Sequence, residues 1–87
     1  MKTYEALKTV NDAVASRINE LLAKNKISQY RLIQNSGLST SRLSCIMRGK
    51  NKTVTLSTVM LLAQGFGISL TEFLDSTYFD MSKLEIE

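Results

Sequence analysis

The residues best suited to chemistry are small polar side chains on one face of an expected helix. This stripe consists of Ser41, Ser44, Cys45 and Arg48, with Thr40 at its N-terminal edge. The first four follow one another at positions i, i+3, i+4 and i+7, which lie on the same side of an α-helix. Hydroxyl groups hydrogen bond to several base edges, and small side chains let a helix approach the floor of the DNA major groove. We expect all five residues to contact DNA bases. The alternative is an exposed helix face on which serine serves only solubility.

Polar and basic residues on either side of this stripe are suited to phosphate groups. The expected start of the preceding helix offers free N–H groups and the positive end of a helix dipole, which attract anions. A basic loop follows the stripe. The residues that we expect to contact the DNA backbone are Ser28, Gln29, Arg42, Lys50, Asn51 and Lys52. The alternative for the loop is a solvated segment without a partner.

The charge of the chain is unevenly distributed. The net charge is only +3, but residues 17–52 carry eight Lys or Arg against a single Glu, a balance of +7. Residues 53–87 carry a net −4, and residues 1–16 are neutral. Such asymmetry indicates a polyanionic partner for the middle of the chain.

The elements that must position these residues are helices. Apolar residues recur at steps of three and four through most of the 87-residue chain. The expected helices span residues 11–24, 29–35, 40–48, 56–67 and 70–76. Their expected N-caps are Asn11, Ser28, Ser39, Thr55 and Ser69, the last in a capping box with Glu72. A chain of this length supports a single all-α domain with one small core.

The two ends of the chain are less regular than residues 11–76, which form the expected helical domain. Residues 1–10 are expected to form either an N-terminal arm or extra helical turns. Residues 77–87 form an acidic C-terminal tail without firm structure, although residues 83–87 have a weak pattern for a short edge strand. The apolar residues of this tail also make it a candidate segment for binding a protein partner.

The composition excludes several classes of protein. The chain has no histidine, and Cys45 is its single cysteine, which excludes His-based catalysis, His-ligated metals and an intramolecular disulfide. No apolar run reaches the roughly 18–20 residues of a membrane span, and the N-terminus lacks the apolar core of a signal peptide. We therefore expect a cytoplasmic protein that is not an enzyme and needs no cofactor. Redox sensing by Cys45 is an alternative to a packing role.

The segment from Ser28 to Gly49 has the pattern of two short helices joined by a tight turn. Apolar residues stand where the two helices need contacts with each other, namely at Leu32, Leu38, Leu43 and Ile46. The motifs are ISQYRL at 27–32, SGLS at 36–39, LSCIMRGK at 43–50 and ISLTEFL at 68–74. In these motifs the chain resembles the lambda-repressor-like, Cro-type helix-turn-helix family, also called the xenobiotic-response-element group.

This resemblance covers roughly residues 12–76 and carries expectations about fold and function. It implies a five-helix, all-α domain that binds double-stranded DNA, usually as a homodimer on a pseudo-palindromic operator. It also implies base contacts from four positions, which are Thr40, Ser41, Ser44 and Cys45. Two positions depart from the family: Ile33 stands where alanine is usual, and Ser36 where an aliphatic residue is usual.

The residues and the resemblance together predict a sequence-specific DNA-binding protein, a bacterial or phage transcriptional regulator that acts as a repressor. One alternative is the antitoxin of a toxin–antitoxin pair, which binds a toxin through its tail and also regulates its own operon. Another is a helix-turn-helix adaptor that binds proteins and not DNA. The +7 charge of the middle block argues against the adaptor.

Overall fold

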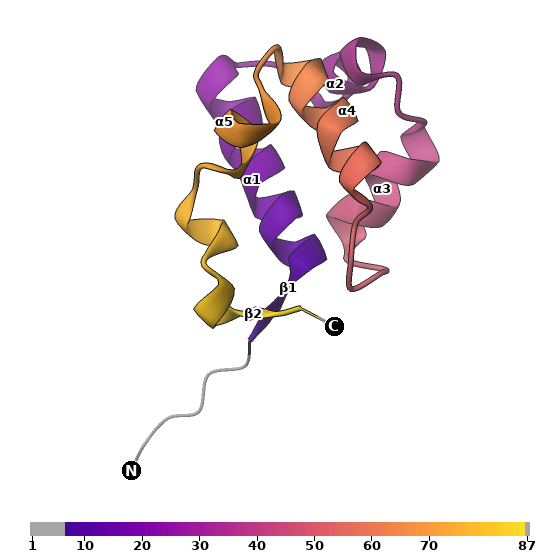
Figure 1. The fold of residues 1–87 in the computed structure, drawn as a ribbon. Coiled ribbons are helices and arrows are strands. Elements are labelled where there is room, and N and C mark those ends of the chain that lie inside the picture. The colour runs from indigo at the N-terminus through magenta and orange to yellow at the C-terminus, as the bar shows by residue number, and fades with distance from the viewer. Residues whose placement is uncertain (1–6, 87) are drawn as a thin grey trace.

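Five α-helices each begin directly after a hydroxyl residue whose side chain accepts a backbone N–H from the first turn. These N-caps are Thr9, Ser28, Ser39, Thr55 and Ser69. The computed structural model describes residues 7–86, and its helices are α1 (Val10–Asn25), α2 (Gln29–Ser36), α3 (Thr40–Arg48), α4 (Leu56–Phe66) and α5 (Leu70–Leu74) (Figure 1). The expected five-helix, all-α fold is confirmed.

The start of α1 corrects one expected N-cap. Thr9, and not Asn11, caps this helix, because its hydroxyl accepts the Asp12 N–H at 3.0 Å. The Asp12 carboxylate in turn accepts the Thr9 N–H at 3.1 Å, which completes a capping box. Asn11 lies inside the helix and is only 1% exposed, because the buried face that contains Val14 and Ile18 extends back to it. The helix therefore runs from Val10 to Asn25 instead of from 11 to 24.

The centre of the core takes one large apolar side chain from each helix. These residues are Ile18, Leu32, Leu43, Leu62 and Phe73, each with at most 1% of its surface exposed. The Phe73 ring also lies between two others, with its centroid 6.5 Å from that of Phe66 and 6.2 Å from that of Phe79. Burial of an apolar side chain of this size contributes about 1.5–3 kcal/mol. This shared core holds α2 and α3 in a fixed relation to the rest of the domain.

Helices α2 and α4 approach each other closely at Gly65. A Cβ atom at this position would lie 2.8 Å from both the Leu32 Cδ1 and the Ser36 Cβ, and 3.2 Å from the Ser36 Cα. Glycine at Gly65 thus lets the backbone of α2 come within contact distance of α4. The requirement is one of space, because Gly65 lies within a helix and does not have a positive φ.

Replacing Gly65 with alanine is therefore expected to destabilise the domain by about 1–3 kcal/mol, the usual effect of overpacking a core. The gain of about 1 kcal/mol in helix propensity offsets only part of this loss. The midpoint of urea unfolding measures the change. The matched control is Gln64→Ala on the exposed face of the same helix, which should change stability little. A Gly65→Ala variant as stable as the wild type would contradict the close packing of α2 on α4.

The C-terminal segment packs against the domain from which it emerges. After α5, two 3₁₀ turns at Thr77–Phe79 and Met81–Lys83 lead to the strand β2 (Leu84–Glu85). β2 pairs in parallel with β1 (Lys8–Thr9), so the expected edge strand within 83–87 is confirmed at two residues. The extra helical turns considered for residues 1–10 are absent from residues 7–9, and residues 1–6 lie outside the described part of the chain.

The second 3₁₀ turn is held by a local cap at Asp80. The hydroxyl of Ser82 donates to the Asp80 carboxylate at 2.7 Å, and the Ser82 N–H donates to the same oxygen at 3.0 Å. These two hydrogen bonds, helped by the charge of Lys83, lower the pKa of Asp80 below its ordinary value. The segment that the sequence left without firm structure thus has defined local geometry.

Candidate nucleic-acid interface

Helices α2 and α3 are joined by a tight turn that two hydrogen bonds hold. Gly37 adopts a φ of +80°, and its N–H donates to the Ile33 carbonyl at 3.0 Å. The hydroxyl of Ser36 is buried and accepts the Leu38 N–H at 3.1 Å. Serine at this position, where an aliphatic residue is usual, therefore supplies a hydrogen bond that holds the turn.

The base-contacting residues predicted from the sequence all lie on α3. Thr40, Ser41 and Arg48 are exposed, while Ser44 and Cys45 are half-buried. On the opposite face of the helix, Leu43 and Ile46 are buried in the core. Within residues 7–86, the side chains of Ser41, Ser44 and Arg48 take part in no hydrogen bond or ion pair. Their polar groups are thus available to an external partner.

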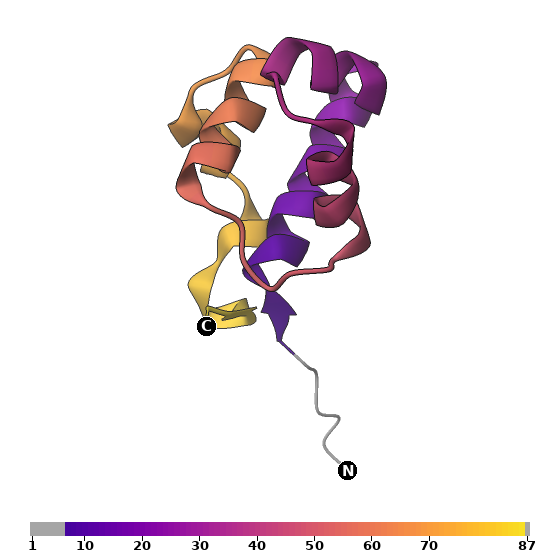
Figure 2. The same ribbon diagram turned by 90° about the vertical axis from the view of Figure 1, so that its right-hand side faces the viewer.

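The residues predicted to contact phosphates lie at the start of α2, in the first turn of α3 and in the loop after α3. Helix α2 lies near the top of Figure 1 and the loop 49–55 lies below α3, and Figure 2 shows α2 and α3 on the near side. Gln29, Arg42 and the loop residues 50–52 are exposed. The Ser28 hydroxyl accepts the Arg31 N–H at 3.1 Å, and its own proton remains able to donate. A polyanion that runs along this side can therefore meet all three groups.

One residue of the basic block has a structural role. The guanidinium of Arg17 donates to the carbonyls of Phe73 and Glu72, each at 2.8 Å, and forms an ion pair with Glu20 at 2.6 Å. Its side chain is only 11% exposed. Arg17 therefore satisfies carbonyl groups at the end of α5 and is not available to an external anion. The remaining basic residues of the block, all exposed, are Lys24, Lys26, Arg31, Arg42, Arg48, Lys50 and Lys52.

The basic loop after α3 lies close to an acidic residue of the C-terminal segment. The Nζ of Lys52 is 3.7 Å from the Glu85 carboxylate on β2, so the C-terminal segment reaches the basic loop.

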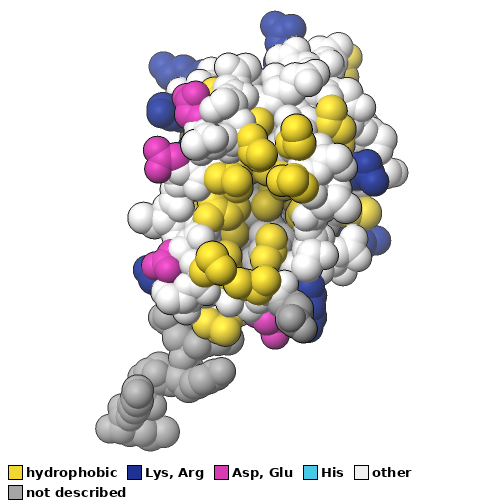
Figure 3. All heavy atoms as spheres, in the orientation of Figure 1, with side chains coloured by type: hydrophobic (Ala, Val, Ile, Leu, Met, Phe, Trp, Pro, Cys, Tyr) yellow, Lys and Arg dark blue, Asp and Glu magenta, His cyan; other side chains and the backbone are white. Residues whose placement is uncertain are grey.

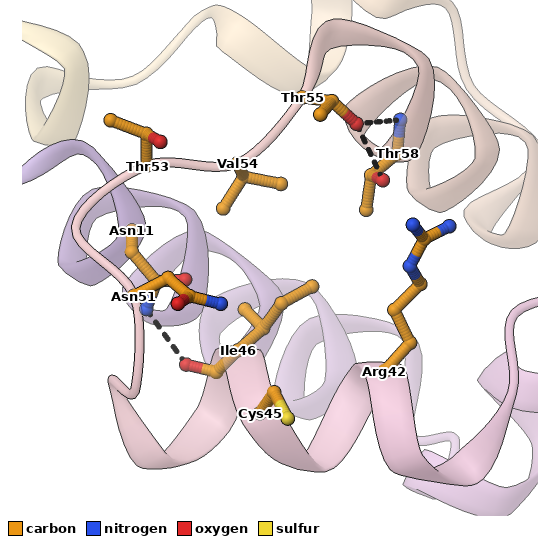
Figure 4. Close-up of a pocket in the computed structure, with 9 residues that line it drawn as sticks. All are labelled: Asn11, Arg42, Cys45, Ile46, Asn51, Thr53, Val54, Thr55 and Thr58. Atoms are coloured by element: carbon orange, nitrogen blue, oxygen red, sulfur yellow. Dashed lines mark hydrogen bonds between the residues drawn. The ribbon is translucent and has the colours of Figure 1, made fainter.

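A small cleft of about 120 Å³ lies between α3 and the segment that leads into α4 (Figure 4). Arg42 and Cys45 line the α3 side of this cleft, and Thr55 and Thr58 line the α4 side. Cys45 is thus the residue of the stripe that borders this cleft.

Other functional classes find little in the described part of the chain. Among residues 7–86 there is no group of three or more Cys, Asp or Glu side chains that could hold a metal ion. None of the helices in this part is long and apolar enough to cross a membrane.

Two short helices joined by a tight turn, the second of which presents polar side chains and has basic residues at both of its ends, form the arrangement of a helix-turn-helix DNA-binding domain. Comparison with protein families agrees with this class. The model of the Cro/C1-type HTH DNA-binding domain matches residues 17–77, and the chain belongs to this family. The resemblance noted in the sequence is thereby confirmed. No curated protein shows significant similarity to the chain.

The residue that the sequence did not place correctly is Asn11. Its side-chain Nδ2 donates to the Ile46 carbonyl in α3 at 2.9 Å (Figure 4). The sequence carries a signal for this contact, since Asn11 precedes Val14 and Ile18 by three and seven residues and so shares their buried face. A polar residue on a buried face must find a hydrogen-bond partner there.

Proposed function

We propose that the protein is a sequence-specific transcriptional regulator that binds double-stranded DNA and represses by occluding a promoter. In this proposal α3 enters the major groove and α2 crosses the backbone. The base-contacting residues are Thr40, Ser41, Ser44, Cys45 and Arg48. The observation that carries the proposal is the polar stripe on α3, which has no partner within residues 7–86 for its Ser41, Ser44 and Arg48 groups.

The proposed phosphate contacts hold the backbone on both sides of the groove that α3 enters. The amino end of α2, with Ser28 and Gln29, grips the backbone on one side of the groove. Arg42 and the loop residues 50–52 grip it on the other. Contacts of this kind fix the register of the helix without reading sequence, so that the α3 side chains meet the base edges.

Because one short helix contacts only a few base pairs, we expect the protein to bind DNA as a homodimer. The face shown in Figure 3 carries many apolar side chains. Among the exposed large apolar residues of the described chain, Leu56 and Met60 lie on α4 and Leu74 lies on α5. Leu56 is 62% exposed and Met60 52%. This face lies a quarter turn from the side of α2 and α3 seen in Figure 2. We assign it to a second copy, because a two-fold axis there leaves both α3 helices free to meet a pseudo-palindromic operator.

The dimer is tested by sedimentation of a Leu56→Glu, Met60→Glu double variant. Two buried carboxylates would oppose association, so the variant is expected to sediment as a monomer and the wild type as a dimer. Tyr30→Glu is the matched control, since Tyr30 is 69% exposed on α2 and its replacement should leave the dimer intact. A wild-type protein that is monomeric both alone and on DNA would remove the dimer from the proposal.

Loss of the two central serines is expected to abolish much of the discrimination by α3. In a Ser41→Ala, Ser44→Ala double variant, the ratio of operator to random-DNA affinity should fall about tenfold or more, because good base contacts contribute about 1–3 kcal/mol each. Competition binding with labelled operator measures the ratio. Thr71→Ala on α5 removes an exposed hydroxyl away from α3 and serves as the control. If the double variant kept the wild-type ratio, the stripe would not be the reader.

The experiment that tests the whole proposal is the selection of bound sites from random double-stranded DNA. A regulator of this design should enrich a sequence with two inverted half-sites about one helical turn apart, roughly 34 Å. The absence of any enriched sequence would contradict sequence-specific binding. Enrichment of a single half-site would contradict the dimer alone.

A further inference from the structure

We infer that Asn11 is a positioning residue for the DNA-contacting surface. Its side chain holds the end of α3, and its backbone amide holds the basic loop that follows. This inference rests on the proposed function, since it concerns how that surface is prepared for DNA. Asn11 lies outside the part of the chain that matches the family model, which begins at residue 17.

Asn11 makes two hydrogen bonds to the segment that carries the DNA contacts. The Nδ2 of its buried side chain donates to the Ile46 carbonyl at 2.9 Å. Its backbone N–H donates to the Lys52 carbonyl at 3.0 Å. Both acceptors belong to the segment from α3 to the basic loop, whereas Asn11 belongs to the first turn of α1. One residue thus ties α1 to two points of that segment.

The first hydrogen bond acts at the C-terminal end of α3. The last carbonyl groups of a helix lack partners within that helix. The Ile46 carbonyl accepts the Gly49 N–H at 3.1 Å, and Asn11 provides a second donor to the same oxygen. Gly49 reverses the chain here with a φ of +69°. Asn11 therefore fixes the last turn of α3, which carries Arg48.

The second hydrogen bond acts on a loop with little support of its own. Residues 51–54 belong to no helix or strand. Within residues 7–86, the bond between the Asn11 N–H and the Lys52 carbonyl is the single hydrogen bond that the backbone of these four residues makes. A loop held in its bound conformation loses less freedom when it binds. The bond thus prepares Lys50, Asn51 and Lys52 for the phosphate backbone.

The position of Asn11 in the cleft of Figure 4 supports the same role. Its side chain lines this cleft together with Ile46 and Asn51. Arg42 and Cys45 line the same cleft from α3. A change at Asn11 therefore reaches residues of both the base-contacting and the phosphate-contacting sets without touching DNA.

The test compares Asn11→Ala with Val14→Ala, which lies one turn later on the same helix and is equally buried. Both variants lose buried contacts, but only the first loses the bond to Ile46. Operator affinity is measured at several salt concentrations and at a temperature where circular dichroism shows both variants folded. Asn11→Ala is expected to bind the selected operator about tenfold more weakly than Val14→Ala. Its plot of log affinity against log salt should keep the slope of Val14→Ala, because the backbone bond from residue 11 to the Lys52 carbonyl is present in both variants.

Equal affinities for the two variants would overturn the inference, because the role of Asn11 would then be stability alone. A wild-type protein that binds no DNA would instead overturn the proposed function, so the two failures are distinguishable. If Asn11→Ala does not fold, hydrogen exchange of the wild type decides. Operator binding is expected to slow exchange of the Asn11 amide at least several-fold, because DNA holds the loop whose Lys52 carbonyl accepts it. An unchanged rate would overturn the inference.

Discussion

A Phe73→Ala variant is expected to lose about 3–5 kcal/mol of stability, the usual effect of removing a fully buried phenylalanine ring. Domains of this size are stable by only about 5–15 kcal/mol, with short chains toward the lower end. A substantial unfolded population is therefore expected at room temperature. Phe73 is completely buried, and its ring joins α5 to α4 through Phe66 and to the C-terminal segment through Phe79.

The Phe73 prediction is checked by the midpoint of chemical denaturation followed by circular dichroism. Phe73→Leu keeps most of the apolar volume and should lose considerably less stability than the alanine variant. Tyr78→Ala lies in the neighbouring 3₁₀ turn with a side chain that is 41% exposed, and it controls for a general effect of removing an aromatic ring there. Similar midpoints for Phe73→Ala and Tyr78→Ala would show that the aromatic cluster is not central to stability.

The contribution of each protomer to operator affinity is expected to fall by about 10²–10³-fold when the salt concentration rises from about 50 to about 200 mM. The reason is the release of counterions from DNA. About five phosphate contacts per protomer give a slope near −4.5 in a plot of log affinity against log salt. Four exposed basic residues on α3 and the loop after it can supply most of these contacts, namely Arg42, Arg48, Lys50 and Lys52. Lys52 is the one among them with an ion-pair partner in residues 7–86.

Single charge removals locate these contacts. Lys50→Gln and Lys52→Gln should each make the slope shallower by about 0.9, the value for one phosphate contact. Lys83→Gln changes the net charge equally but lies in the C-terminal segment beside α1, so its slope should match that of the wild type. Affinity that is independent of salt, or an equal effect of all three variants, would contradict phosphate anchoring by the loop.

The helix starts and the α3 stripe could be predicted because both depend on local sequence. A hydroxyl cap such as Ser28 or Ser39 satisfies an N–H only three residues away. The stripe follows from helical periodicity alone. The capping box predicted at Ser69 is only half formed. Ser69 accepts the Glu72 N–H, but within the described residues the Glu72 carboxylate does not accept the Ser69 N–H in return.

The features that the sequence did not predict depend on contacts between distant segments. Asparagine is a residue type that favours the N-cap position, yet the side chain of Asn11 donates a hydrogen bond to the Ile46 carbonyl in another helix. Arg17 counts as a basic residue in the sequence, but its partners are carbonyl groups of α5. Gly65 resembles any glycine near a helix end until the position of Ser36 is known. Propensity and periodicity describe single elements, and these residues act where two elements meet.

The pairing of β1 with β2 has a consequence for the order in which the chain folds. The two strands join residues 8–9 to residues 84–85, so the pairing closes a loop that includes all five helices. Contacts so distant in sequence form late, whereas helical turns form from near neighbours. The pairing consists of only two residues in each strand, which makes it a region of low local stability as well. We therefore expect this seam to be the last part of the domain to close and the first to open, and Glu85 to leave Lys52 each time it does.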